Sequence, residues 1–123
     1  MNTGKKILII EDGTTLLAEL QYIANKFDLE FFSTDGVVQF QDIKTLSPEL
    51  IIFYNWINDQ SVIDLCFDLR TSAITEKILI IILAEYNSHE KIALESCADF
   101  CIKKPYNINQ LLLLIVHMLQ SPC

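Results

Sequence analysis

The chain has 123 residues, of which 51% are hydrophobic and 20% charged, and its formal net charge is −7 at pH 7. We expect residues 1–123 to form one ordinary domain with a single core. The acidic balance argues against direct nucleic-acid contact, which needs clustered Lys and Arg, and against an anionic membrane surface. The apolar runs are too short for a bilayer, which takes roughly 20 residues, and no cleavable leader is recognisable, so a cytoplasmic protein is expected.

Apolar runs rich in isoleucine mark the strands, in chain order. The segments Ile7–Ile10, Leu50–Phe53 and Ile78–Leu83 are continuous runs of the kind that parallel strands show when helices cover both faces. Two weaker candidates, Leu29–Ser33 and Phe100–Lys103, are expected nearer the edges of the sheet.

Helical patterns fill the segments between these strands. The first helix is predicted from apolar residues that share one face, namely Leu16, Leu20, Ile23, Ala24 and Phe27. The second follows from Phe40, Ile43 and Leu46, and it should end before Pro48.

Capping signals mark the starts of three further helices. The pairs lie at Ser61–Asp64, Asn87–Glu90 and Asn107–Gln110, each with a capping residue three positions before its partner. Five strands then alternate with five helices, which predicts an α/β fold with an open, doubly wound parallel sheet.

The cysteines indicate neither disulfides nor a metal site. The four of them, Cys66, Cys97, Cys101 and Cys123, have no C-x-x-C pairing, and the histidines have no regular ligand spacing to them. We expect reduced thiols that act mostly as small apolar residues.

In a doubly wound sheet, ligands bind at the carboxyl ends of the strands near the topological switch point. Glu11 and Asp12 follow the first strand, and Tyr54 ends the third. Leu83 ends the fourth strand, and Lys104 follows the fifth. These five residues define the candidate pocket.

The segments "KKILIIEDG", "SPELIIFYNWINDQSVIDLCFDLR" and "ESCADFCIKKPYNINQLL" resemble the receiver domain of two-component response regulators over nearly the whole chain. The resemblance implies a flavodoxin-like, CheY-like sandwich with strand order 2-1-3-4-5. It also implies an acidic pair that helps to hold Mg²⁺, matched by Glu11 and Asp12, and a phosphate-contacting lysine, matched by Lys104.

Three positions depart from the family pattern. The phosphoacceptor aspartate is matched by Tyr54, the Thr or Ser that ends strand four is Leu83, and the switch aromatic is Cys101. Phosphoryl transfer needs an ionised oxygen beside Mg²⁺, and a phenol with an ordinary pKa of ~10 is ionised to only about one part in a thousand at pH 7. We therefore expect a pseudo-receiver without conventional phosphorylation, without a cofactor and without enzymatic activity.

Several interpretations of the pocket remain open. Tyr54 is expected to fill the space of the ion and the phosphoryl group, with Lys104 as an internal counter-ion and the hydroxyl bonded to one of the acids. The alternatives are a divalent ion on Glu11 and Asp12, and phosphorylation at an unusual residue such as Asp59 or at Tyr54 by a tyrosine kinase. A ligand-binding flavodoxin-like domain is a further alternative, although the chain has only three glycines and no Gly-rich phosphate loop.

The last helix predicts an interaction surface. Its inward stripe needs only four residues: Leu111, Leu112, Ile115 and Leu119. Leu113, Leu114 and Val116 then remain on the outside, and together with Cys101 they predict an apolar partner surface. We expect a cytoplasmic protein–protein interaction module of bacterial signalling, with a homodimer through the fourth and fifth helices as one option; an exposed apolar helix without a partner is the alternative.

Overall fold

Five parallel strands form the centre of the molecule: β1 (Lys5–Glu11), β2 (Leu29–Thr34), β3 (Leu50–Tyr54), β4 (Leu79–Ala84) and β5 (Phe100–Lys103). They lie in the order β2-β1-β3-β4-β5, and all four neighbouring pairs are parallel. The structure is a computed structural model that describes residues 5–24, 27–35, 38–54, 59–84, 91–92, 98–103 and 106–120. The predicted strand positions and strand order are both confirmed.

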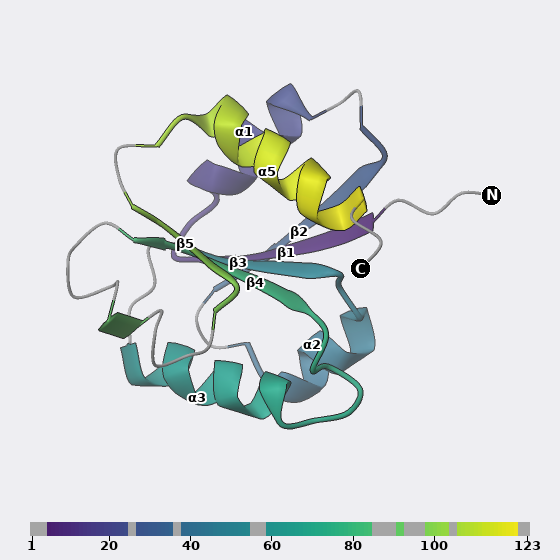
Figure 1. Cartoon of the computed structure of the whole chain (residues 1–123), viewed down its shortest axis with the longest axis vertical. Helices are drawn as coiled ribbons and strands as arrows, with labels where there is room; N and C mark the ends of the chain where they lie inside the picture. Colours follow the sequence, from purple (N-terminus) through teal and green to yellow (C-terminus); the bar gives the residue numbers. More distant parts are fainter. Residues whose placement is uncertain are drawn as a thin grey trace.

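Helices cover both faces of this sheet (Figure 1). On one face lie α1 (Thr15–Ile23) and α5 (Ile108–Gln120), and on the other lie α2 (Phe40–Leu46) and α3 (Asp59–Arg70). The described residues therefore contain four helices and not the predicted five. The predicted start of the other helix, Asn87–Glu90, lies outside the described residues, although Lys91 and Ile92 have helical backbone.

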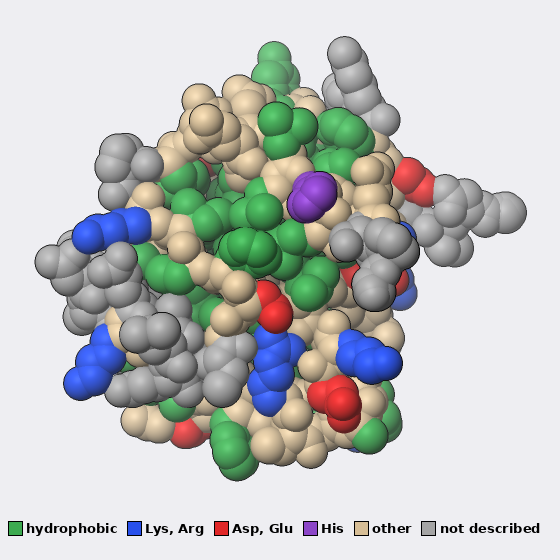
Figure 2. All heavy atoms as spheres, viewed as in Figure 1, with side chains coloured by type: hydrophobic (Ala, Val, Ile, Leu, Met, Phe, Trp, Pro, Cys, Tyr) green, Lys and Arg blue, Asp and Glu red, His purple; other side chains and the backbone are tan. Residues whose placement is uncertain are grey.

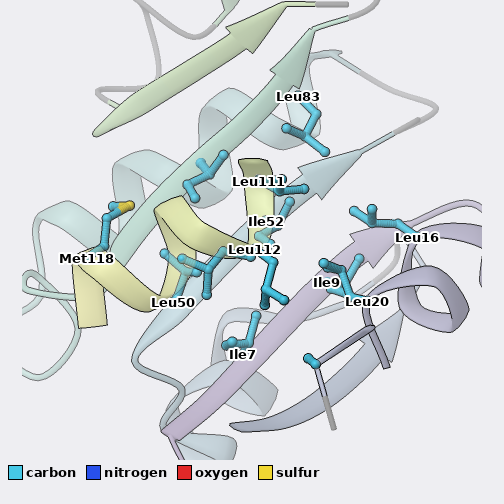
Figure 3. Packing of buried hydrophobic residues seen from close by; sticks show 13 residues of the cluster. Ile7, Ile9, Leu16, Leu20, Leu50, Ile52, Leu83, Leu111, Leu112 and Met118 are labelled. Carbon is cyan, nitrogen blue, oxygen red and sulfur yellow. The ribbon is translucent and has the colours of Figure 1, made fainter. Parts of the chain in front are cut away.

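Alternate residues of the central strands supply two separate cores. The α1/α5 face receives Ile7, Ile9, Leu50, Ile52, Ile81 and Leu83, and Figure 3 shows most of these packed beneath α5 and beside α1. The opposite face receives Leu8, Ile10, Ile51, Phe53, Ile80 and Ile82. Because both faces are covered, the strands are apolar at every position and not only at alternate ones.

Two helix boundaries differ from the predicted ones. α1 ends at Ile23 with Ala24 as its C-cap, so Phe27 lies beyond the helix and is 38% exposed. α3 begins at Asp59, which places Ser61 inside the helix and not at its cap. The carboxylate of Asp64 accepts a hydrogen bond of 2.8 Å from the side chain of Gln60, one turn earlier in the same helix.

Two other boundary predictions are correct. α2 ends at Leu46, and Ser47 takes a left-handed conformation with φ of 57° before the buried Pro48. The Asn107 side chain accepts hydrogen bonds from the backbone N–H groups of Asn109 and Gln110, at 2.8 and 3.3 Å, and so caps α5. Among the described residues, no helix is long and apolar enough to cross a membrane.

Candidate functional site

The carboxyl end of the sheet carries one row of neighbouring side chains. Glu11 is in register with Tyr54, Tyr54 with Leu83, and Leu83 with Ile102. Register neighbours in a parallel sheet point to the same face, and here that is the α1/α5 face: Leu83 belongs to its core, and Tyr54 and Ile102 pack against that core. The row thus brings together three of the five predicted pocket residues: Glu11, Tyr54 and Leu83.

Glu11 is a buried carboxylate that caps the start of α1. It is 2% exposed, and its Oε1 and Oε2 accept hydrogen bonds from the backbone N–H groups of Leu16 and Leu17, at 3.2 and 3.1 Å. The first N–H groups of a helix have no partner within the helix, and the N-cap residue Thr14 makes no side-chain capping bond. The carboxylate of Glu11, at the end of β1, therefore compensates the partial positive charge at the N-terminus of α1.

The signal for this capping role lay in the sequence. Glu11 precedes the helix by only a short turn, whose Gly13 has a φ of 120° that favours glycine. A short turn brings the end of a strand close to the first amides of the following helix. The family resemblance directed attention to metal binding, and the capping role of the carboxylate was missed for that reason.

The other predicted pocket residues lie in different surroundings. Asp12 is exposed, and Tyr54 is half-buried against the α1/α5 core. Leu83 is 1% exposed. Lys104 lies outside the described residues, so its expected role as a counter-ion stays a prediction.

The hydroxyl of Tyr54 was expected to bond to one of the acids, and this bond stays a prediction. Within the described part of the chain, the hydrogen-bond partners of Glu11 are the two α1 amides. The contacts of Tyr54 that the structure gives are apolar.

The residues present do not fit the divalent ion that the resemblance implies. Both oxygens of Glu11 already accept hydrogen bonds from α1, and a neutral phenol stands beside it in the row. Hard cations such as Mg²⁺ need several carboxylate or carbonyl oxygens free to turn toward them. Within the described ranges, no group of three or more His, Cys, Asp or Glu residues could hold a metal ion.

The predicted partner surface on α5 is only partly exposed. Leu113 is 62% exposed, whereas Leu114 and Val116 are half-buried and pack partly against the core. Cys101 on β5 is exposed. Figure 2 shows hydrophobic side chains gathered over α5 on this face of the molecule.

The inward stripe of α5 differs at one position from the prediction. The buried residues are Leu111, Leu112, Ile115 and Met118. Leu119 is only half-buried. Met118 is placed three residues after Ile115, and this spacing keeps it on the core side of the helix.

Several solved structures share this fold. A signal receiver domain of a histidine kinase from Syntrophus aciditrophicus is 24% identical with a TM-score of 0.75, over 94% of this chain and 90% of that one. A response regulator receiver modulated diguanylate cyclase from Pelobacter carbinolicus is 26% identical with a TM-score of 0.68, over 94% and 92%. The chain has the receiver-domain fold.

A third structure with the receiver fold contains a metal ion. The receiver domain of a sensor histidine kinase from Pseudomonas aeruginosa PAO1 is 14% identical with a TM-score of 0.75, over 96% of this chain and 99% of that one, and it has a magnesium ion in its active-site cleft. No protein-family model and no curated protein matches the sequence of the present chain. The CheY-like, flavodoxin-like architecture is thus shared, although identity is low.

Proposed function

We propose that this chain is a phosphorylation-independent receiver domain of two-component signalling, which acts by binding a protein partner and has no enzymatic activity. The observation that carries the proposal is the row Glu11–Tyr54–Leu83 at the carboxyl end of the sheet. In that row one carboxylate is used by a helix start, and the two positions next to it are a phenol and a buried aliphatic side chain.

Acyl-phosphate chemistry needs three things at this place in the fold. A carboxylate must attack the donor phosphorus, a divalent ion must neutralise the developing charge, and a hydroxyl must receive a phosphoryl oxygen. Tyr54 replaces the first and Leu83 the third, and Glu11 is engaged elsewhere. A buried leucine cannot donate a hydrogen bond, so a phosphoryl group would lack its partner.

The partner-binding part of the proposal is supported by the surface of α5. Leu113 is among the most exposed large hydrophobic residues of the described chain, and Leu114 and Val116 continue the apolar surface around it. Contiguous exposed apolar side chains mark protein contacts more often than isolated ones do. The proposed occupant is a protein of the signalling pathway or a second copy of this chain.

Intact-mass measurement after incubation with acetyl phosphate and Mg²⁺ tests the first part. The expected result is an unmodified mass under conditions in which a conventional receiver domain, treated in parallel, gains one phosphoryl group. A Mg²⁺-dependent gain of one phosphoryl group on this chain would overturn phosphorylation independence. Hydroxylamine would release the group from an acyl phosphate, such as one on Asp59, but not from a phosphotyrosine. Asp59→Asn and Tyr54→Phe would then show which side chain had accepted the group.

Substitution on α5 tests the second part. Leu113→Glu should abolish concentration-dependent self-association in analytical ultracentrifugation, because it places a charge within the apolar surface. Tyr22→Glu is the matched control, since Tyr22 is 83% exposed on α1 and lies outside the proposed surface. A wild type that stays monomeric at every concentration would refute the homodimer, and equal loss in both variants would refute the surface.

A further inference from the structure

A hollow lies at the amino end of the sheet, opposite the candidate pocket residues. Its volume is about 360 Å³, which is at the lower end of the range for small-molecule sites. It is bounded by the first residue of β1, the end of α2, the turn before β4 and the last turns of α5. None of the predicted pocket residues lines it.

Part of the lining of this hollow is apolar, beside the polar side chains of Ser47 and Thr75. Pro48 and Ile78 are buried in it, and Met118 and Leu119 of α5 close one side. Ile74 stands at the hollow with 71% of its surface exposed, although it is a large aliphatic residue. A ligand with an apolar body would remove part of this surface from water, which favours binding.

Three lysines surround the same hollow. Lys5, Lys44 and Lys77 line it, and Glu49 is the one acid among its lining residues. Within the described part of the chain, none of the three lysines has a carboxylate partner; the ion pair there joins Arg70 to Asp99. The lining residues thus carry a net charge of three minus one, or +2, in a chain whose formal net charge is −7.

Helix ends explain some of the positive charge at this end of the sheet, but not all of it. The Nζ of Lys6 donates to the carbonyl of Leu46 at 3.3 Å, in the last turn of α2, and Lys44 lies in that turn too. Such cations stabilise the negative end of a helix. Lys5 begins a strand and Lys77 lies in the turn before β4, so helix capping does not account for them.

We propose that this hollow binds a small organic anion, whose phosphate or carboxylate head is held by Lys5, Lys44 and Lys77 and whose apolar body lies against Ile74 and Leu119. An adjoining hollow of about 210 Å³ shares Lys5 and Leu119 with the first and provides room for a longer body. The proposal does not depend on the function proposed for the carboxyl end or for α5.

Titration of the isotope-labelled protein with phenyl phosphate, followed by amide NMR shifts, tests this site. The expected result is saturable shifts at Ser47, Glu49 and Lys77, with the amides of Glu11 and Tyr54 unchanged. Inorganic phosphate supplies the head alone and benzyl alcohol the body alone, and both should bind more weakly. Benzoate distinguishes a carboxylate head from a phosphate head.

A double lysine variant tests whether the positive charge of the hollow contributes to binding the anion. Lys44→Ala combined with Lys77→Ala should raise the Kd for phenyl phosphate by about five- to tenfold, as expected for two exposed ionic contacts. Lys91→Ala is the matched control, because Lys91 is exposed and does not line the hollow. The proposal fails if no saturable shift occurs, if inorganic phosphate binds as tightly as phenyl phosphate, or if the control weakens binding as much as the double variant.

Discussion

The charged side chains at the two ends of the parallel sheet have different surroundings. At the carboxyl end, the buried charge of Glu11 is satisfied by the first amides of α1, and the neighbouring row is aromatic and aliphatic. At the amino end, three lysines surround an open hollow without a carboxylate partner among the described residues. The end that holds the candidate pocket residues is the packed one.

This difference concerns how the side chains at each end are used. The strand order is that of the receiver fold, and the side chains of the row Glu11–Tyr54–Leu83 pack against the core or cap α1. A side chain used in this way contributes to folding stability, whereas a side chain kept for binding contributes little or nothing. Stability measurements therefore distinguish the two ends.

The largest effect is expected for Leu83→Ala. Leu83 is 1% exposed and lies in the α1/α5 core, so truncation should lower the free energy of unfolding by about 2–5 kcal/mol. Urea denaturation monitored by circular dichroism measures this loss. An effect below about 1 kcal/mol would mean that the carboxyl end tolerates a cavity, which would contradict the description of it as packed.

A smaller effect is expected for Glu11→Ala. Two amides of α1 would lose a charged acceptor in a buried place, and the free energy of unfolding should fall by about 2–3 kcal/mol. Glu11→Gln keeps one acceptor oxygen and should lose about half as much. The matched control is Asp12→Ala, which removes an exposed acid and should change stability by less than about 1 kcal/mol.

Equal losses for Glu11→Ala and Asp12→Ala would contradict the capping role. The melting temperature with added Mg²⁺ is a second test of the roles of Glu11 and Asp12. Because Glu11 is engaged by the helix, millimolar Mg²⁺ should leave the melting temperature unchanged, whereas an ion bound by both acids would raise it.

The sequence was sufficient to predict the strands and the sheet, because runs such as Ile7–Ile10 and Leu50–Phe53 are apolar at every position. A continuous run of this length requires burial on both faces, which only a doubly wound sheet provides here. The strand order was predicted from the resemblance to receiver domains and not from these runs. The start of α5 was predicted equally well, since Asn107 has both the residue type and the spacing of a cap.

Boundaries and partners were harder to predict because they depend on contacts between distant residues. The start of α3 at Asp59 is not visible from Ser61–Asp64, because Asp64 bonds to Gln60 instead. The hollow at the amino end was missed for the same reason, since Lys5, Lys44 and Lys77 are far apart in the sequence. Only the crossovers of the fold bring them together.

The smallest effects are expected at the amino end, where they separate Arg70, which bonds to neighbouring groups, from Lys77, which has no carboxylate partner among the described residues. The Arg70 guanidinium donates to the carbonyls of Glu76 and Ile78, at 3.1 and 2.7 Å, and pairs with Asp99 at 2.6 Å. Arg70→Ala should therefore lower the free energy of unfolding by about 1–2 kcal/mol.

Lys77→Ala is the comparison within the same turn region. It should change the free energy of unfolding by no more than about 0.5 kcal/mol, because Lys77 is exposed and no described carboxylate pairs with it. A loss as large as that of Arg70→Ala in parallel urea titrations would show that Lys77 serves the fold. The lysines of the hollow would then contribute to folding stability, as the side chains at the carboxyl end do. The contrast between the two ends of the sheet would disappear.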